Sequence, residues 1–187
     1  MADNYLEKKM EDYNRMRPAP AKIRRSLPRS KQGLLVETGE LRILVSDIDA
    51  VWGRSLVGAF RESGCKVAFM SADSRKGTKT AQATGSLFYP AHKTNESVLQ
   101  ALDYLASHWG GIDAVILTPV DSTLELPERI TRIVIGTEGV IRQDCSATYI
   151  NISDESVDMA ALGRFCVFLC SDSGKGLRGQ SFRMAGA

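Results

Sequence analysis

The stretch LRILVSDIDAVWGRSLVGAFRESG, residues 41–64, decides the fold. It opens with a short apolar run of strand length, and the residues behind that run place Val51, Leu56, Val57 and Phe60 on one face of a helix. Gly64 is suited to end this helix, because glycine readily adopts the left-handed conformation common at helix C-termini. We therefore expect a buried strand that leads directly into an amphipathic helix.

The same alternation of strand and helix continues along the chain. Apolar runs of strand length occupy residues 66–72, 85–91 and 112–120, and residues 95–111 have a helical pattern that begins at an asparagine or threonine cap. Strands that are apolar on both faces and alternate with helices are typical of a parallel sheet covered on both sides. The sequence therefore predicts an α/β fold.

The C-terminal third is expected to add four more elements. We predict a helix over residues 128–143, a strand over 147–153, a further helix over 156–174 and a last strand over 180–186. The division into domains follows from the other end of the chain. Residues 1–40 are interpreted as an amphipathic helix followed by a basic, proline-containing arm, and residues 41–187 as one domain.

Composition excludes several classes of function. The chain has 187 residues and a formal net charge of only +2, which gives no general argument for nucleic acid. The charge is uneven, however, because residues 14–31 hold seven basic and no acidic side chains: Arg15, Arg17, Lys22, Arg24, Arg25, Arg29 and Lys31. Four cysteines without a CxxC pair and two histidines form no recognisable metal motif. No apolar run is long enough for a membrane helix, so we expect a cytoplasmic protein.

Four stretches resemble the short-chain dehydrogenase/reductase family. Residues 42–56 are similar to its first strand and glycine-rich turn, 110–120 to its fourth strand, 148–156 to its fifth strand, and 162–187 to its last helix and strand. The resemblance implies a Rossmann-like, doubly wound parallel sheet with helices on both faces, preceded here by the N-terminal helical arm. We expect about six strands in the order 3-2-1-4-5-7, because the family's sixth strand has no counterpart in the sequence.

The glycine turn departs from the family pattern TGxxxGxG. The eight corresponding places run from Ser46 to Gly53, and Gly53 is the one glycine retained. Val51 puts a branched side chain where phosphate should lie, and we interpret Asp47 and Asp49 as carboxylates that take the place of cofactor phosphate and cap the helix behind them. The alternative is a remodelled loop that still binds NAD or NADP through Arg54.

By family position, the cofactor-binding candidates are Ser46, Gly53, Arg54 and Ser71. Ser71 falls at the end of the second strand, where the family selects between NAD and NADP. Arg75 and Lys76 lie just beyond it, where two basic side chains could meet a 2′-phosphate and so favour NADP. We interpret them instead as solvated charges in a loop.

The residues that the family uses for catalysis are not found. It uses a serine after the fifth strand, where this chain has Asp154, and a tyrosine and lysine spaced YxxxK on a helix that the sequence lacks. Two YxxxK strings, beginning at Tyr5 and Tyr89, occur elsewhere and are interpreted as coincidences. We predict no catalytic and no metal-binding residues.

Three functions are left open by these observations. The favoured one is a non-catalytic scaffold, a pseudoenzyme that acts through a protein partner or through a homodimer formed by the C-terminal helix and strand. The second is an NAD(P)-dependent oxidoreductase with a remodelled cofactor loop. The third, which we favour least, is a nucleic-acid binder that uses the basic arm of residues 15–31.

Overall fold

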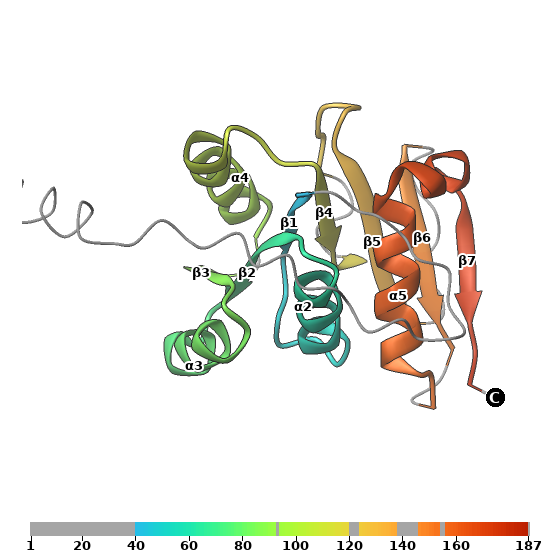
Figure 1. Cartoon of the computed structure of the whole chain (residues 1–187), viewed down its shortest axis with the longest axis horizontal. Helices are drawn as coiled ribbons and strands as arrows, with labels where there is room; N and C mark the ends of the chain where they lie inside the picture. The colour runs from blue at the N-terminus through green and yellow to red at the C-terminus, as the bar shows by residue number, and fades with distance from the viewer. Residues whose placement is uncertain (1–39, 93, 120–123, 138–145, 154–155, 187) are drawn as a thin grey trace, which may run out of the picture. The chain divides into compact units, whose positions relative to one another are not determined.

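A computed structural model describes residues 40–92, 94–119, 124–137, 146–153 and 156–186. Its centre is a seven-stranded sheet in which every neighbouring pair is parallel, in the order β3-β2-β1-β4-β5-β6-β7 (Figure 1). The strands are β1 (Arg42–Val45), β2 (Lys66–Ser71), β3 (Leu87–Pro90), β4 (Ala114–Leu117), β5 (Thr131–Thr137), β6 (Ala147–Ile152) and β7 (Ser181–Met184).

Helices cover both faces of this sheet. Three of them, α2 (Gly53–Glu62), α3 (Ser74–Thr84) and α5 (Met159–Cys170), lie on one face, and α4 (Asn95–Trp109) lies on the other (Figure 1). A 3-10 helix, η2 (Asp172–Leu177), leads from α5 towards β7. The doubly wound Rossmann-like architecture predicted from the sequence is therefore confirmed. Within the described ranges, no helix is long and apolar enough to cross a membrane.

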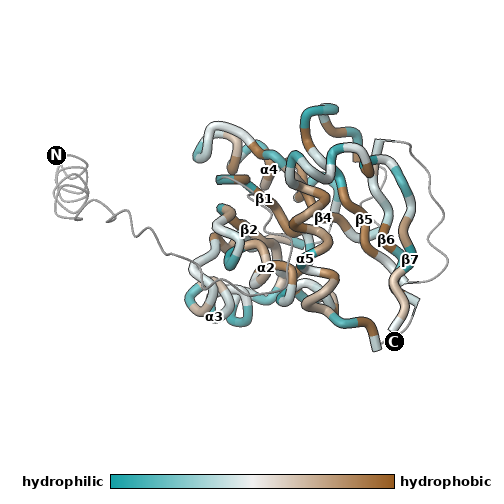
Figure 2. Tube along the Cα trace, turned by 45° about the vertical axis from the view of Figure 1, so that its right-hand side comes forward, coloured by the Kyte–Doolittle hydropathy of each residue, from teal (hydrophilic) through white to brown (hydrophobic). Residues whose placement is uncertain are grey.

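The core consists of two apolar layers, one on each face of the sheet. Ile43, Val45 and Ile133 point towards α2 and α5, while Leu44, Val115 and Val134 belong to the layer under α4. Figure 2 shows that hydrophobic residues concentrate in the central strands. Successive strand residues alternate between the layers, and both layers are buried, so the strands read as continuous apolar runs.

The helix predicted over residues 128–143 is wrong in its described part, because residues 131–137 form strand β5. Isoleucine and valine at 133–135 are β-branched, and such side chains fit a pleated sheet better than a helix. β5 pairs with β4 on one side and β6 on the other, and both of its faces are buried from Thr131 to Gly136. Burial on both faces removes the polar alternation that would have identified the strand.

This strand corrects the predicted order and strand number. β5 takes the fifth place in the sheet, so residues 147–152 form the sixth strand and not the fifth. The sixth strand is thus present, and the sheet has seven strands instead of about six. What is short is the connection before it: nine residues, 138–146, separate β5 from β6. A crossover between parallel strands usually takes a dozen or more residues when it contains a helix.

The described residues begin at Glu40, so the N-terminal helix and the basic arm lie outside them. The domain boundary between residues 40 and 41 stays a prediction. Arg75 and Lys76 were expected in a loop but lie in the first turn of α3. The predicted helix C-terminus near Gly64 is confirmed, since α2 ends at Glu62 and Gly64 has a φ of 87°.

Candidate functional site

The candidate site is a pocket of about 600 Å³ at the carboxyl ends of the strands. In doubly wound sheets ligands bind at this edge, near the point where the strand order reverses. The pocket lies between the start of α2, the ends of β4, β5 and β6, and the start of α5. Its described lining residues are Ala50, Val51, Trp52, Thr118, Pro119, Ile135, Gly136, Thr137, Ile152, Ser153 and Met159.

The turn between β1 and α2 is bonded internally through a buried carboxylate. Oδ1 of Asp47 accepts hydrogen bonds from the backbone N–H groups of Asp49 at 2.9 Å and Ala50 at 3.2 Å. Asp47 is only 5% exposed. The expectation that these carboxylates cap the helix is wrong, because the N-cap of α2 is Trp52, it has no side-chain cap, and the first turn holds no acidic residue. The carboxylate binds amides of the turn itself.

Gly53, the one glycine kept from the family pattern, is required by packing. A Cβ atom at this position would lie 2.5 Å from the carbonyl oxygen of Asp47 and 2.6 Å from that of Ile48. Of the three glycines in such a turn, the third allows close packing of helix on strand, and the second allows the backbone to approach a pyrophosphate. This chain therefore keeps the glycine that serves packing and lacks the one that serves phosphate.

Val51 occupies the place of the second glycine and lines the pocket. Its side chain is 81% exposed, although the sequence placed it on the buried face of the helix. The reason is that α2 begins at Gly53, so Val51 belongs to the turn before it. Leu56, Val57 and Phe60, the other three residues of that predicted face, are buried as expected.

The polar groups at the end of β2 are bonded to one another. Ser71 is 1% exposed, and its Oγ donates to Oδ2 of Asp49 at 2.8 Å and accepts from the backbone N–H of Asp73 at 3.1 Å. Asp73 caps α3 by accepting from the backbone N–H groups of Lys76 and Arg75, both at 3.0 Å. The bond from Lys76 is the main cause that lowers the pKa of Asp73.

The four cofactor-binding candidates do not form one surface. Ser46 and Ser71 are each 1% exposed and lie behind the turn, where the N–H of Ser46 donates to the carbonyl of Ile116 at 2.9 Å. Gly53 is buried against the turn, and Arg54 is exposed on the first turn of α2. Whether any of them binds a cofactor stays a prediction. None of the four is among the described residues that line the pocket.

Of the residues that line the pocket, Val51 was placed at the cofactor position by the sequence, and most of the others were missed. Trp52, Ile135 and Met159 come from three separate elements, and nothing in the local pattern of each one marks it as part of a site. The available signal was positional, because each lies at the carboxyl end of a strand or the start of a helix. Recognising β5 as a strand would have been needed to use it.

The new place of β6 corrects the predicted catalytic position. Asp154 follows the sixth strand, so it does not correspond to the family's serine, which follows the fifth. The residues after β5, 138–145, lie outside the described part, as do Asp154 and the string that begins at Tyr5.

Tyr89 lies on β3 with its ring centroid 5.7 Å from that of Tyr104, and the lysine of its string is not described. Among the described residues, no group of histidine, cysteine and carboxylate side chains could hold a metal.

No family model matches the chain, and no curated relative matches it. Several solved structures do match the chain. A short-chain dehydrogenase/reductase of Brucella melitensis has a TM-score of 0.64 at 10% identity, over 81% of this chain and 97% of that one. An enoyl-(acyl-carrier-protein) reductase of Anaplasma phagocytophilum in complex with NAD has a TM-score of 0.62 at 13% identity, over 81% and 94%. A ribose-5-phosphate isomerase of Brucella melitensis has a TM-score of 0.67 at 14% identity, over 82% and 94%. At these identities the likeness establishes the fold, and it confirms the predicted resemblance to the short-chain dehydrogenase/reductase fold.

Proposed function

We propose that this chain is a non-catalytic relative of the short-chain dehydrogenases/reductases that binds no dinucleotide. The observation that carries the proposal is the turn between β1 and α2, where Gly53 serves packing and Val51 replaces the glycine of phosphate approach. Asp47 adds a buried carboxylate that already accepts from two amides of this turn. A pyrophosphate would meet a branched side chain and a negative charge, so the residues present do not fit NAD or NADP.

The lining of the pocket supports the same proposal. Oxidoreductases of this fold must move a proton at the substrate, and general acid–base catalysis needs a titratable side chain within hydrogen-bond reach. The described lining is mainly apolar around Trp52, Ile135 and Met159, and its polar side chains are the hydroxyls of Thr118, Thr137 and Ser153. None of these described groups titrates near neutral pH.

The second candidate function, an NAD(P)-dependent oxidoreductase, is favoured by one observation. A pocket of about 600 Å³ lies where this fold binds its ligands, and Trp52 forms part of its lining. Arg54 lies nearby in sequence and is exposed on the first turn of α2, where it could meet a phosphate. The two candidates differ in whether a dinucleotide enters this pocket.

Energy transfer from Trp52 to the reduced nicotinamide distinguishes them directly. The chain has two tryptophans, so a Trp109→Phe variant leaves Trp52 as the sole donor. We expect no transfer at millimolar NADH or NADPH. Saturable transfer from Trp52 would support the oxidoreductase and overturn the proposal. A Val51→Gly variant is the matched control, because removing this exposed side chain tests whether it is what excludes the phosphate.

We further propose that the scaffold acts as a homodimer through α5 and β7. β7 is the last strand of the sheet in the described chain. The N–H groups of Tyr149 and Ser153 in the β6 segment donate to the carbonyls of Gln180 and Met184, so the backbone N–H of Ser181 points away from β6. An outward row of this kind is a template for pairing with another strand, and a second copy of β7 would extend the sheet.

Two further predictions concern a nucleic-acid partner and the location of the protein in the cell. Nucleic-acid binding through residues 15–31 is the least favoured alternative, and binding that weakens steeply with added salt would support it. A cytoplasmic location is supported by Cys65, Cys166 and Cys170, which are thiols buried in the core.

A further inference from the structure

A second pocket lies at the opposite end of the strands from the candidate site. It has a volume of about 260 Å³ and is lined by the amino ends of β5 and β6 and by the segment between η2 and β7. β5 contributes Arg132 to this pocket and Gly136 to the other one. Four residues along a strand span about 13 Å, so the two pockets are separate sites.

Two arginines give this pocket its chemistry. Arg132 and Arg178 both line it, and the one described acidic residue in the lining is Glu128, which is exposed. Arg132 is 8% exposed, and its Nη1 donates to the carbonyl of Leu124 at 2.8 Å, which fixes the side chain. Among the described lining residues, two guanidinium groups stand against one carboxylate.

Arg178 has a buried donor that nothing in the described chain uses. Its Nε is buried and has no hydrogen-bond partner, while its Nη2 donates to the carbonyl of Cys170 at 3.4 Å. A buried donor without a partner is costly, and the groups that can complete such a donor in a folded protein are an ordered water, an ion or a ligand. The adjacent Gly179 lies in the same lining, with its N–H bonded to Oγ1 of Thr148.

A purely structural role for Arg178 accounts for only part of this arrangement. Cys170 is the last residue of α5, and a cation beside the final carbonyls of a helix is favourable. That role explains the contact of Nη2. It leaves Nε unexplained, and it does not require a second arginine in the same pocket.

We propose that this pocket binds a small oxyanion of the phosphate type, held by Arg178 with the help of Arg132. Guanidinium groups match the geometry of phosphate oxygens and bind them through paired N–H donors. A volume of about 260 Å³ is sufficient for a single phosphate group or a small phosphate monoester. The site is independent of the proposed function, since it shares no lining residue with the pocket at Trp52.

The test is an NMR titration of the full chain that follows the Nε–Hε resonance of Arg178 while inorganic phosphate is added. We expect a saturable shift at millimolar phosphate that sodium chloride of equal ionic strength does not reproduce. Glycerol 3-phosphate is titrated in parallel. Tighter binding of this ester would assign the pocket to phosphate monoesters, and tighter binding of inorganic phosphate would assign it to the free ion; both results uphold the proposal.

Three variants sharpen the measurement. Arg178→Gln lacks the Nε–Hε group, so its titration follows the backbone amide resonance of Gly179 in the same lining, and we expect phosphate binding to weaken by about tenfold or more. Glu128→Gln, a change in an exposed loop, should tighten it by roughly twofold to fivefold, because a like charge is removed from the lining. Arg54→Gln, an exposed arginine outside the lining, is the matched control and should bind as the wild type does. The absence of a saturable shift, an equal shift with chloride, or unchanged binding by a folded Arg178→Gln protein would overturn the proposal.

Discussion

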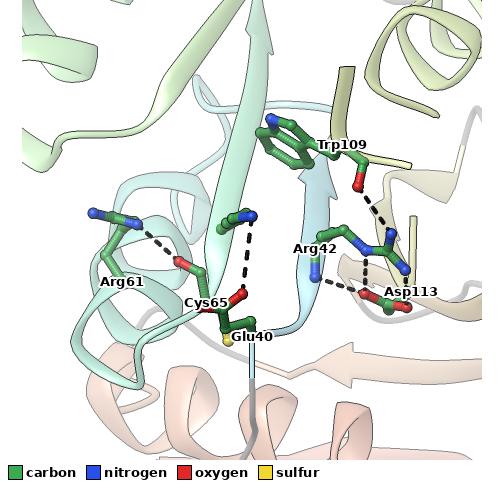
Figure 3. A network of polar contacts seen from close by, with 7 residues as sticks. Glu40, Arg42, Arg61, Cys65, Trp109 and Asp113 are labelled. Atoms are coloured by element: carbon green, nitrogen blue, oxygen red, sulfur yellow. Dashed lines mark hydrogen bonds and ion pairs between the residues drawn. The ribbon is translucent and has the colours of Figure 1, made fainter. Parts of the chain in front are cut away.

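Arg42 and Asp113 form a two-pronged ion pair that joins the start of β1 to the residue before β4. Nε of Arg42 donates to one carboxylate oxygen at 2.9 Å and Nη2 donates to the other at 2.9 Å (Figure 3). The backbone N–H of Arg42 adds a third bond to the same carboxylate at 2.8 Å, and Nη1 donates to the carbonyl of Trp109, the last residue of α4. The pair therefore fixes the ends of three elements with one arginine.

Replacing Asp113 with asparagine tests how much this pair contributes. An amide cannot accept both guanidinium bonds and carries no charge. We therefore expect the free energy of unfolding to fall by about 1–2 kcal/mol, a figure that already allows for the partial exposure of both side chains. Urea unfolding followed by circular dichroism measures this loss. A Lys66→Gln variant is the control, since the contact of Lys66 with Glu40 is 4.0 Å long and exposed and should contribute almost nothing.

The pH dependence gives the same pair a second test. The hydrogen bond from Arg42 holds the pKa of Asp113 below its ordinary value of 3.8. Because the native pKa lies below the unfolded one, the stabilisation is fully present above the unfolded pKa and is lost as the pH falls through the native pKa. The difference in unfolding free energy between wild type and Asp113→Asn should stay constant from pH 7 to about pH 5 and shrink below about pH 4. A difference that grows on acidification would contradict the assigned cause.

Two glycines of α2, Gly53 and Gly58, allow the effect of close packing to be measured separately from the effect of helix propensity. A Cβ at Gly53 would collide with backbone carbonyls at 2.5 and 2.6 Å, whereas one at Gly58 meets nothing within 4 Å. We expect Gly53→Ala to destabilise the protein by about 1–3 kcal/mol. Gly58→Ala should stabilise it by about 0.5–1 kcal/mol, because alanine suits a helix interior better. Thermal or urea unfolding measures both changes, and a tolerated alanine at position 53 would show that the retained glycine does not serve packing.

Three thiols should be unreactive in the native protein. Cys65, Cys166 and Cys170 are buried, and burial raises the pKa of Cys166 and of Cys170, so the nucleophilic thiolate is suppressed. We expect an aromatic disulfide reagent to label none of the three at neutral pH, as located by mass spectrometry. All four cysteines of the chain should react in denaturant. Rapid labelling of native Cys166 would be incompatible with this core.

The proposed dimer can be tested at the outer edge of β7. Ser181→Pro removes an N–H that points away from β6, so the fold should survive while pairing with a second strand is blocked. Light scattering after gel filtration should give a dimer for the wild type and for Ser181→Ala, and a monomer for Ser181→Pro. A wild-type monomer would refute the assembly, and so would a dimer that the proline leaves intact.

The sequence predicted most of the fold because most helices and strands have a recognisable local pattern of apolar and capping residues. Residues 66–71 form a short apolar run, and Thr94 caps α4 through its side chain, as the local pattern indicated. β5 was missed because residues 128–143 were interpreted as one continuous segment of helical length, and periodicity alone does not distinguish a strand buried on both faces from part of a buried helix. That single error also displaced β6 and, with it, the position taken for the catalytic serine.

The site was predicted less well, for a different physical reason. Gly53 could be singled out, because a family pattern with one glycine left is visible in the sequence. It was predicted as a cofactor-binding residue, and its packing against the carbonyls of Asp47 and Ile48 is seen only in the structure. The partners of Asp47 could not be anticipated, since its carboxylate accepts from the amides two and three residues further along the chain and leaves the start of α2 uncapped. The pocket around Trp52 and Met159 joins residues more than a hundred positions apart, and only the topology brings them together.

The most direct test of the central claim is a thermal unfolding scan of the purified protein with millimolar NADPH, with millimolar NADH and without ligand. A ligand at about 100 times its dissociation constant would stabilise the native state by about 2.7 kcal/mol and raise the melting temperature by several degrees. The account predicts the same melting temperature in all three samples. A clear rise with either dinucleotide would contradict it and would make the pocket at Trp52 a working cofactor site.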